Sequence, residues 1–290
     1  MAAGWSAVQV PGAVIYVRPG QTTLAGHMRE MVQSELPRVA QYFGVQSPGP
    51  FAIYAYDSYA EFLEATGINP DLRGESRGPT GEIRLYARGD VDSVRRILAH
   101  ELTHSVLDQR LGLHIGALPT WVNEGLAGHL SEPISPGELP GASRQVHRNG
   151  VLSLDELDVA FSSTGSHDAA YLQSRSMVAW LEYRHPGALR RLVDGLANRK
   201  SFEDALGDAA QLTPSEWWKQ WETNIPAYIY WLNYLSSPVI YAPAAFLVIF
   251  VAILRALRKR REAEEEDEVE EPQSGNNEMA HLDEELLEDQ

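Results

Sequence analysis

The chain of 290 residues contains no cysteine, which excludes disulfide bonds, thiolate metal ligands and cysteine nucleophiles. It also lacks an excess of basic residues, since its formal net charge is −16. A nucleic-acid-binding surface needs a basic face, so we expect no nucleic-acid partner. The charge is uneven, because five basic and 14 acidic residues lie between Arg255 and Gln290. The rest of the chain is therefore only mildly acidic.

No export signal is visible, since the first 17 residues contain neither a basic segment nor a long apolar run. A shorter uncharged apolar run extends over 16 residues from Val239 to Leu254, where a membrane span needs ~20. Five basic residues follow it in "RALRKRR". Aromatic residues typical of a membrane interface precede it: Tyr228, Tyr230, Trp231 and Tyr234. The pattern predicts one transmembrane helix from Val239 to about Leu257.

The basic cluster predicts the orientation of this helix, because positively charged residues favour the cytoplasmic side. We therefore expect a single-pass protein of the cell membrane, with the preceding domain outside, the C-terminus in the cytoplasm and the lipid bilayer as a partner. An export signal is then expected to be missing from this sequence. Two alternatives stay open, namely the opposite orientation and a buried core helix. Residues 258–290 are expected to form an acidic, disordered tail, with a possible cytoplasmic partner.

The order of the predicted elements indicates an α+β fold. Strands are predicted at residues 13–20, 50–56 and 82–88, and residues 69–81 form a loop rich in Gly, Pro and Arg. The pattern after Pro119 is helical. We expect a small N-terminal mixed sheet with helices, a helical C-terminal half and the transmembrane helix. The predicted domains are residues 1–226, an interfacial and membrane segment at 227–257, and the tail at 258–290.

The stretch "RRILAHELTHSVLDQRLG" has helical spacing of apolar residues, yet it carries His100, Glu101 and His104 in its middle. Residues four apart share a helix face, so His100 and His104 can bind one metal ion together. Glu101 lies about 100° around the helix, which suits a base rather than a ligand. A catalytic zinc site needs a third protein ligand and an open position for water. Glu124, in "WVNEGLAGHL", offers that ligand after 19 intervening residues.

The motifs "HELTH" and "NEGLA" together resemble the gluzincin metallopeptidases. The run "ILAHELTHSVL…LPTWVNEGLAGHL…YLQSRSMVAWL" is similar to the peptidase MA-like family, over about Ala13 to Asn224. The resemblance implies one zinc ion per chain at His100, His104 and Glu124. It also implies peptide-bond hydrolysis through a metal-activated water, with Glu101 as general base. The metzincin pattern is disfavoured, because its third histidine would fall at Arg110.

One position departs from the pattern of this family. Thermolysin-like enzymes have an aspartate four residues after the ligand glutamate that orients the first zinc histidine, and Gly128 occupies that position here. Ligating histidines usually need such a hydrogen-bond partner. Either a backbone carbonyl or another carboxylate replaces it, or the site is weaker. Asp108 is one candidate, although a solvated position near the helix end is favoured for it. His129 is expected at the surface or beside a ligand rather than as a ligand.

The resemblance also implies a substrate-binding edge strand and a donor for the oxyanion. The expected edge strand is Ile83, Arg84, Leu85 and Tyr86, with an ordinary sheet strand as the alternative. Tyr171 is the expected oxyanion donor, and His167 is the second candidate. A core aromatic role for Tyr171 stays open.

The predicted function is thus that of a membrane-anchored zinc metallopeptidase acting on a peptide or protein substrate. The alternative is a non-catalytic, zinc-stabilised, membrane-anchored binding module. Glu101 favours the enzyme, because a purely structural zinc site has no need of a base beside the metal.

Overall fold

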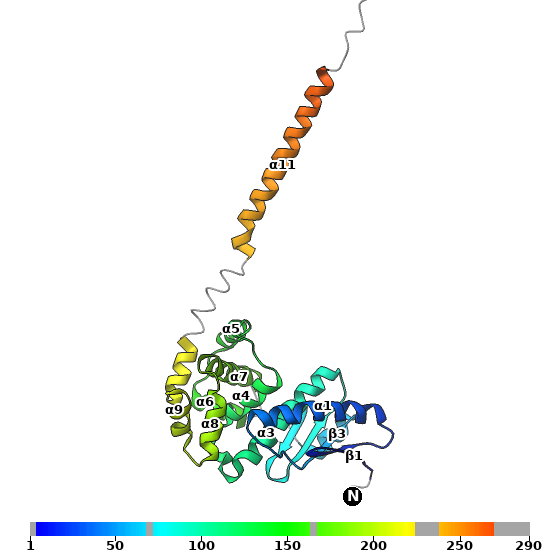
Figure 1. The fold of residues 1–290 in the computed structure, drawn as a ribbon, viewed down its shortest axis with the longest axis vertical. Coiled ribbons are helices and arrows are strands. Elements are labelled where there is room, and N and C mark those ends of the chain that lie inside the picture. Colours follow the sequence, from blue (N-terminus) through cyan, green and yellow to red (C-terminus); the bar gives the residue numbers. More distant parts are fainter. Residues whose placement is uncertain (1–3, 68–71, 163–166, 224–237, 270–290) are drawn as a thin grey trace, which may run out of the picture. The chain divides into compact units, whose positions relative to one another are not determined.

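The computed structural model describes residues 4–67, 72–162, 167–223 and 238–269. The chain forms two compact units, Met1–Tyr230 and Trp231–Gln290. The first unit contains the sheet and the helices packed with it, and the second contains the long helix α11 (Pro238–Val269) (Figure 1).

A five-stranded sheet forms the N-terminal half of the first unit, in the order β1-β2-β3-β5-β4. Its strands are β1 (Ser6–Val10), β2 (Ala13–Val17), β3 (Phe51–Tyr56), β4 (Gly74–Arg77) and β5 (Glu82–Tyr86). The three central strands are parallel, and the outer strands β1 and β4 each pair antiparallel with a neighbour. Alternate residues such as Ile15, Ile53 and Leu85 are fully buried, as the two-residue period of a strand requires.

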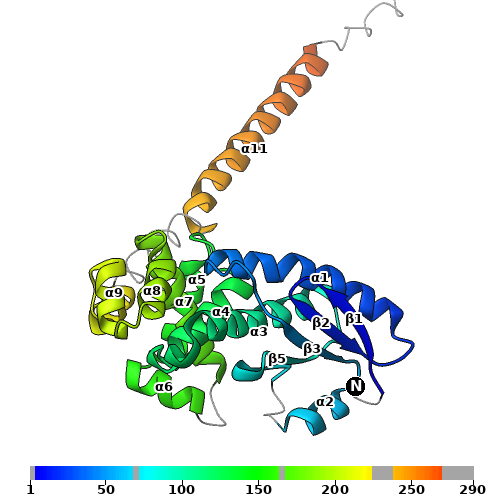
Figure 2. The ribbon, with the colours of Figure 1, turned by 60° about the horizontal axis from the view of Figure 1, so that its bottom comes forward.

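Two long helices pack on one side of this sheet, where the buried strand residues meet them. These helices are α1 (Thr22–Tyr42) and α3 (Val91–Leu111), and they also contact each other. The short helix α2 (Tyr59–Thr66) lies on the other side, as Figure 2 shows. The small mixed sheet and its helices agree with the predicted α+β fold.

The C-terminal half of the first unit is helical, also as predicted. It contains α4 (Thr120–Ser131), α5 (Leu139–Asn149), α6 (Leu154–Ser162), α7 (His167–Arg184), α8 (Ala188–Ala197), α9 (Phe202–Ala210) and a helix at residues 214–223. The strongest packing in this half joins α4 to α7. Trp121 of α4 also packs against Trp217, with ring centroids 4.9 Å apart. This core holds α4 in place beside α3.

The prediction for the substrate-binding edge strand was wrong. Residues 83–86 belong to β5, which lies inside the sheet between β3 and β4. The edge is β4, within the segment predicted as a loop, and the 3-10 turn η1 (Gly78–Thr80) follows it. The loop prediction failed because "GESR" contains no apolar residue, so it lacks the alternation that marks a half-buried strand.

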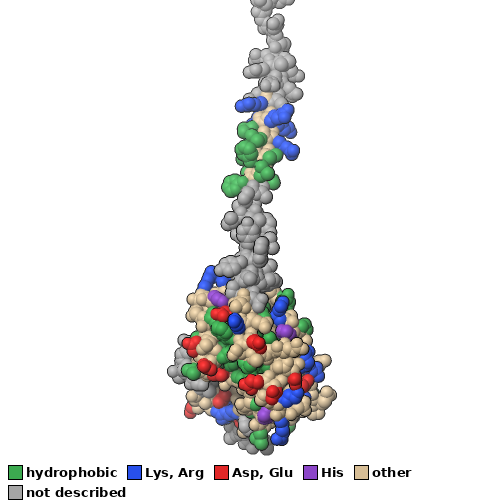
Figure 3. All heavy atoms as spheres, turned by 90° about the vertical axis from the view of Figure 1, so that its left-hand side faces the viewer, with side chains coloured by type: hydrophobic (Ala, Val, Ile, Leu, Met, Phe, Trp, Pro, Cys, Tyr) green, Lys and Arg blue, Asp and Glu red, His purple; other side chains and the backbone are tan. Residues whose placement is uncertain are grey.

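The predicted transmembrane helix was also wrong. Among the described residues, none of the helices combines the length and apolar character that crossing a membrane requires. In α11 the uncharged stretch stops after 17 residues, at Leu254, short of the ~20 of a span, and Arg255 and further charged residues continue the same helix. Figure 3 shows its apolar side chains followed by the basic ones. The predicted location as a single-pass membrane protein depended on this helix and is therefore not supported. The tail was predicted to be disordered from residue 258, but α11 continues to Val269. The rest of the tail and the aromatic residues at 228–234 lie outside the described residues.

Candidate metal centre

Helix α3 carries the first part of the site and is well defined at both ends. The Asp90 side chain accepts a hydrogen bond from the backbone N–H of Ser93, which caps the first turn. Gly112 ends the helix with a φ of 56°, a conformation that favours glycine. Leu98, Leu102 and other apolar residues of α3 are buried against the sheet and its neighbours. The opposite face therefore presents its polar residues towards α4.

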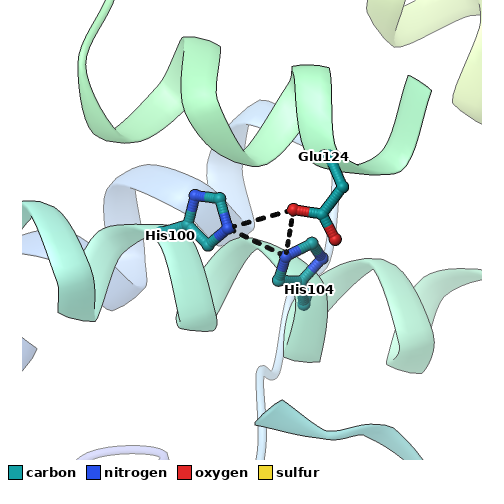
Figure 4. A group of neighbouring side chains, drawn as sticks. All are labelled: His100, His104 and Glu124. Atoms are coloured by element: carbon teal, nitrogen blue, oxygen red, sulfur yellow. Dashed lines mark hydrogen bonds and ion pairs between the residues drawn. The ribbon is translucent and has the colours of Figure 1, made fainter. Parts of the chain in front are cut away.

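Three side chains from α3 and α4 converge at one point (Figure 4). The Nε2 atoms of His100 and His104 lie 3.1 Å apart. Glu124 Oε2 lies 3.3 Å from the first of these nitrogens and 3.6 Å from the second. The structure therefore brings together the three residues that were predicted as metal ligands, and they could hold one metal ion.

The donor atoms have the spacing that a zinc ion needs. Tetrahedral ligands at ~2.1 Å from a common ion lie ~3.4 Å from one another, and the three observed distances bracket that value. Glu124 Oε2 is also buried, and the imidazole nitrogens of His100 and His104 are the partners that the structure gives it. A buried carboxylate oxygen is costly unless a positive charge offsets it, and a proton on an imidazole or a cation between the three side chains would do so. The residues present thus fit the metal that the motif implies.

Asn123 orients one of the histidines, a role that the sequence did not reveal. Its Oδ1 lies 3.1 Å from Nδ1 of His104. When Nδ1–H donates to this oxygen, Nε2 points its lone pair at the other two donor atoms. Asn123 directly precedes Glu124, so α4 supplies both a candidate ligand and the partner of another. Asn123 does not replace the aspartate missing at Gly128, because that residue would orient His100 rather than His104.

The charges of the two helices are coupled across this cluster. Burial lowers the pKa of His104, but the charge of Glu124 and its hydrogen bond outweigh burial and raise that pKa to about 9. Burial raises the pKa of Glu124, but His104 and His100 outweigh it and hold the carboxyl pKa far below its ordinary value. In the metal-free protein the cluster is therefore an ion pair, with a proton where a metal ion would bind.

Glu101 lies beside the cluster, and its carboxylate has no hydrogen-bond donor among the described residues. Its side chain is 7% exposed. Burial raises its pKa, although the two histidines oppose this effect. Gly74 of β4 makes room for it, because a Cβ at that position would lie 2.5 Å from Glu101 Oε1. The edge strand and the base are thus in direct contact.

Tyr171, from α7, completes the wall of the site. Its ring centroid lies 6.1 Å from that of His100 and 5.0 Å from that of Phe161. Burial raises the pKa of the phenol, and the charges and hydrogen bonding of Glu124 raise it further, so the hydroxyl keeps its proton. His167 begins α7, but its side chain is outside the described part of the chain. Tyr171 is therefore the candidate donor that the structure places at the site.

The position without the family's aspartate is filled by α7. A Cβ on Gly128 would lie 3.2 Å from Cδ of Arg175, so the stem of this arginine occupies the space beside α4. The guanidinium pairs with Glu132. His129 is mostly buried, which lowers its pKa, and lies outside the metal cluster. Asp108 contacts none of the candidate ligands by a hydrogen bond among the described residues.

A cavity of about 560 Å³ opens over these groups. Its walls include the candidate ligands, Glu101, Tyr171 and residues of β4. The peptide groups of Gly74 and Ser76 face this side of β4. The N–H of Tyr86 donates to the carbonyl of Arg73, so in the antiparallel ladder residues 73, 75 and 77 bond to β5 while 74 and 76 point outward.

Comparison with known protein families agrees with the geometry of this centre. The sequence model of the peptidase MA superfamily matches residues 31–227, which include β3 to β5, both helices of the metal cluster and Tyr171. No curated protein matches the chain significantly. The match covers more than half of the sequence. The chain therefore belongs to the peptidase MA superfamily, and its domain is a metallopeptidase domain of the gluzincin type.

Proposed function

We propose that this protein is a zinc-dependent peptidase that cleaves peptide or protein substrates in the cavity between β4, α3, α4 and α7. One observation carries the proposal. Three donor atoms with the spacing of zinc ligands share a cavity with Glu101, a buried carboxylate that has no partner among the described residues. A structural metal site would need only the three ligands. The free-energy cost of burying the Glu101 carboxylate would then have no functional return.

The chemistry divides between the metal and the residues around it. A zinc ion held by His100, His104 and Glu124 would polarise the scissile carbonyl and acidify a water molecule. Glu101 would accept the proton of the attacking water at its carboxylate and then deliver it to the leaving amine. Its raised pKa supports this role, because a carboxylate of ordinary acidity would hold the proton less well during the transfer.

Tyr171 would stabilise the charge that develops on the carbonyl oxygen. Its hydroxyl keeps its proton because burial and nearby carboxylates raise the phenol pKa, so it can donate a hydrogen bond throughout the working pH range. Preorganised donors of this kind act strongly where water is excluded.

The free edge of β4 would bind the substrate backbone. Gly74 and Ser76 direct their N–H and C=O groups away from β5, on the side of the cavity. An extended peptide can add to such an edge as a further strand. The site would therefore accept peptides in an extended conformation.

The substitution Glu101→Gln tests the assignment of the base. We expect this variant to keep one zinc ion per chain and to hydrolyse peptides roughly 10²- to 10⁴-fold more slowly, since general-base assistance has that value. Zinc content would be measured by atomic emission and hydrolysis by mass spectrometry of a peptide mixture. His104→Ala serves as the comparison, because it should lose zinc as well as activity.

Two outcomes would contradict the proposal. Unchanged hydrolysis in Glu101→Gln would remove this residue from the mechanism. Wild-type protein that binds one zinc ion at His100, His104 and Glu124 but cleaves no peptide in the mixture would favour a non-catalytic zinc-binding module.

A further inference from the structure

We infer that Asp108 selects substrates with an arginine or lysine about three residues before the scissile bond. The inference rests on the proposed peptidase function and adds a substrate class to it. It starts from a contact between β4 and α3 that lies outside the metal cluster.

Strand β4 and the turn after it follow helix α3 in the same direction. Gly74 contacts Glu101, Ser76 hydrogen-bonds Ser105 through their hydroxyls at 2.8 Å, and Gly78 contacts Asp108. A Cβ on Gly78 would lie 2.1 Å from Asp108 Oδ2. Glycine therefore stands at both positions where a carboxylate of α3 reaches the strand. Asp108 is held at one end of the edge on which the substrate would lie.

The Asp108 carboxylate has no hydrogen bond or ion pair within the described part of the chain, although it is half-buried. Other charged residues of the cavity wall are paired, such as Glu75 with Arg77 and Glu132 with Arg175. Burial raises the pKa of Asp108, and the charge of His104 only partly opposes this effect. A cationic group beside the carboxylate would reverse that effect, because it favours the charged form.

Asp108 also borders a second cavity of about 580 Å³. Pro50, Phe51, Leu113 and Ile115 give this cavity apolar walls, and Asp108 is the only charged residue among the described residues that line it. A lysine or arginine side chain combines a long apolar stem with one positive charge. The apolar walls with a single carboxylate at the border match that chemistry, whereas an acidic side chain would meet a like charge.

The position in the substrate follows from the direction of β4. A peptide that adds antiparallel to β4 begins near Gly78 and ends near Gly74, so the residues before the scissile bond lie towards Asp108. The scissile bond would lie beside the metal, at a height on α3 midway between His100 and His104. Asp108 is six residues further along this helix, or about 9 Å along its axis. That length corresponds to about three residues of extended peptide.

The test uses synthetic peptides and full-length, zinc-loaded protein. Each peptide carries arginine, or its uncharged isostere citrulline, at one position, and mass spectrometry identifies the bond that is cleaved. We expect arginine about three residues before that bond to raise kcat/KM about tenfold over citrulline. Asp108→Asn should abolish the difference and Gly78→Ala should reduce it. Asp92→Asn, an exposed residue in the first turn of the same helix, should preserve it.

Binding provides a second readout that does not need turnover. Fluorescence anisotropy would compare the Kd of the arginine and citrulline peptides for Glu101→Gln protein, with and without Asp108→Asn. We expect the arginine peptide to bind about tenfold more tightly only while Asp108 is present. Equal cleavage and equal binding of the two peptides would overturn this inference alone. Absence of cleavage of every peptide would overturn the proposed function, and the binding comparison would still decide the role of Asp108.

Discussion

Asn123 shows how a single side chain can govern the metal centre without touching the metal. Its Oδ1 accepts a hydrogen bond from Nδ1 of His104, and this contact fixes both the ring orientation and the tautomer that leaves Nε2 free. Glu124 follows it directly in α4. The hydrogen bond therefore links the positions of two candidate ligands from two helices.

We expect Asn123→Ala to weaken zinc binding by roughly 10- to 100-fold, because His104 loses the partner that orients it. Competition with a chromophoric zinc chelator would measure the affinity. Asn123→Asp is the matched control, since it keeps an acceptor at the same place and should bind zinc at least as tightly as wild type. Equal affinity in the alanine variant would show that the ring is held by its packing alone.

The sequence predicted the candidate ligands but not this partner. The positions of His100, Glu101 and His104 follow from the period of one helix, which local spacing fixes. Glu124 was identified through its distance along the chain and the family motif. Which side chain meets Nδ1 of His104 depends instead on how α3 crosses α4, and tertiary packing decides that.

At the scale of the element, the edge strand β4 is the feature with the clearest functional consequence. Its inward peptide groups bond to β5, and the outward groups of Gly74 and Ser76 are directed to the cavity. A proline at an outward position of an edge strand removes one N–H without breaking the ladder.

We therefore expect Ser76→Pro to raise KM for extended peptides about 2- to 10-fold, as the loss of one hydrogen bond predicts. The unfolding midpoint should stay close to that of Ser76→Ala. The alanine variant is the control, because both substitutions remove the hydroxyl that bonds Ser105, and only proline removes the N–H. Steady-state kinetics and thermal unfolding would measure the two effects. An equal KM in both variants would argue against strand addition at β4.

The sequence identified the three central strands and missed the outer strands β1 and β4. β2, β3 and β5 alternate buried and less buried residues, and this alternation is visible in the sequence. β4 is short and polar, and its pairing with β5 depends on a contact that local propensity does not encode. Ser153 with Glu156 and Thr213 with Glu216 form reciprocal capping hydrogen bonds, and the three-residue spacing of these pairs is visible in the sequence because capping is local.

At the scale of the whole molecule, a metal ion and a proton compete for the site formed by His104 and Glu124. This competition makes the stability of the folded protein depend on pH. The pKa of His104 rises from its ordinary value of 6.5 to about 9 in the folded, metal-free protein. A raised pKa stabilises the folded state below pH 6.5, and this contribution disappears as the pH rises through about 9. Zinc displaces the proton, so the zinc-loaded protein does not undergo this loss.

We expect the difference in Tm between zinc-loaded and metal-free protein to widen between pH 6.5 and 9. Differential scanning fluorimetry at several pH values would measure it. His27→Gln, which changes an exposed histidine of α1, should leave the trend intact. His104→Gln should remove it. A difference in Tm that is constant across this range would show that His104 is not protonated in the metal-free protein.

The transmembrane prediction failed at this same scale, because it depended on the length of one run. Sixteen uncharged residues with a basic cluster beyond them are typical of a membrane anchor, and the same residues also fit one long helix that continues into charge. In α11 the apolar residues from Phe246 to Leu257 are exposed together. Composition alone did not distinguish these cases.

The contact of β4 with α3 also sets a limit on how this protein can diverge in evolution. Gly74, Ser76 and Gly78 meet Glu101, Ser105 and Asp108 in register. An insertion or deletion of one residue between Gly74 and Gly78 would turn every second side chain of the strand to the opposite face and drive Glu75 or Arg77 into the carboxylates of α3. Homologues that keep the active site should therefore align across residues 74–78 without a gap, even where neighbouring segments change in length.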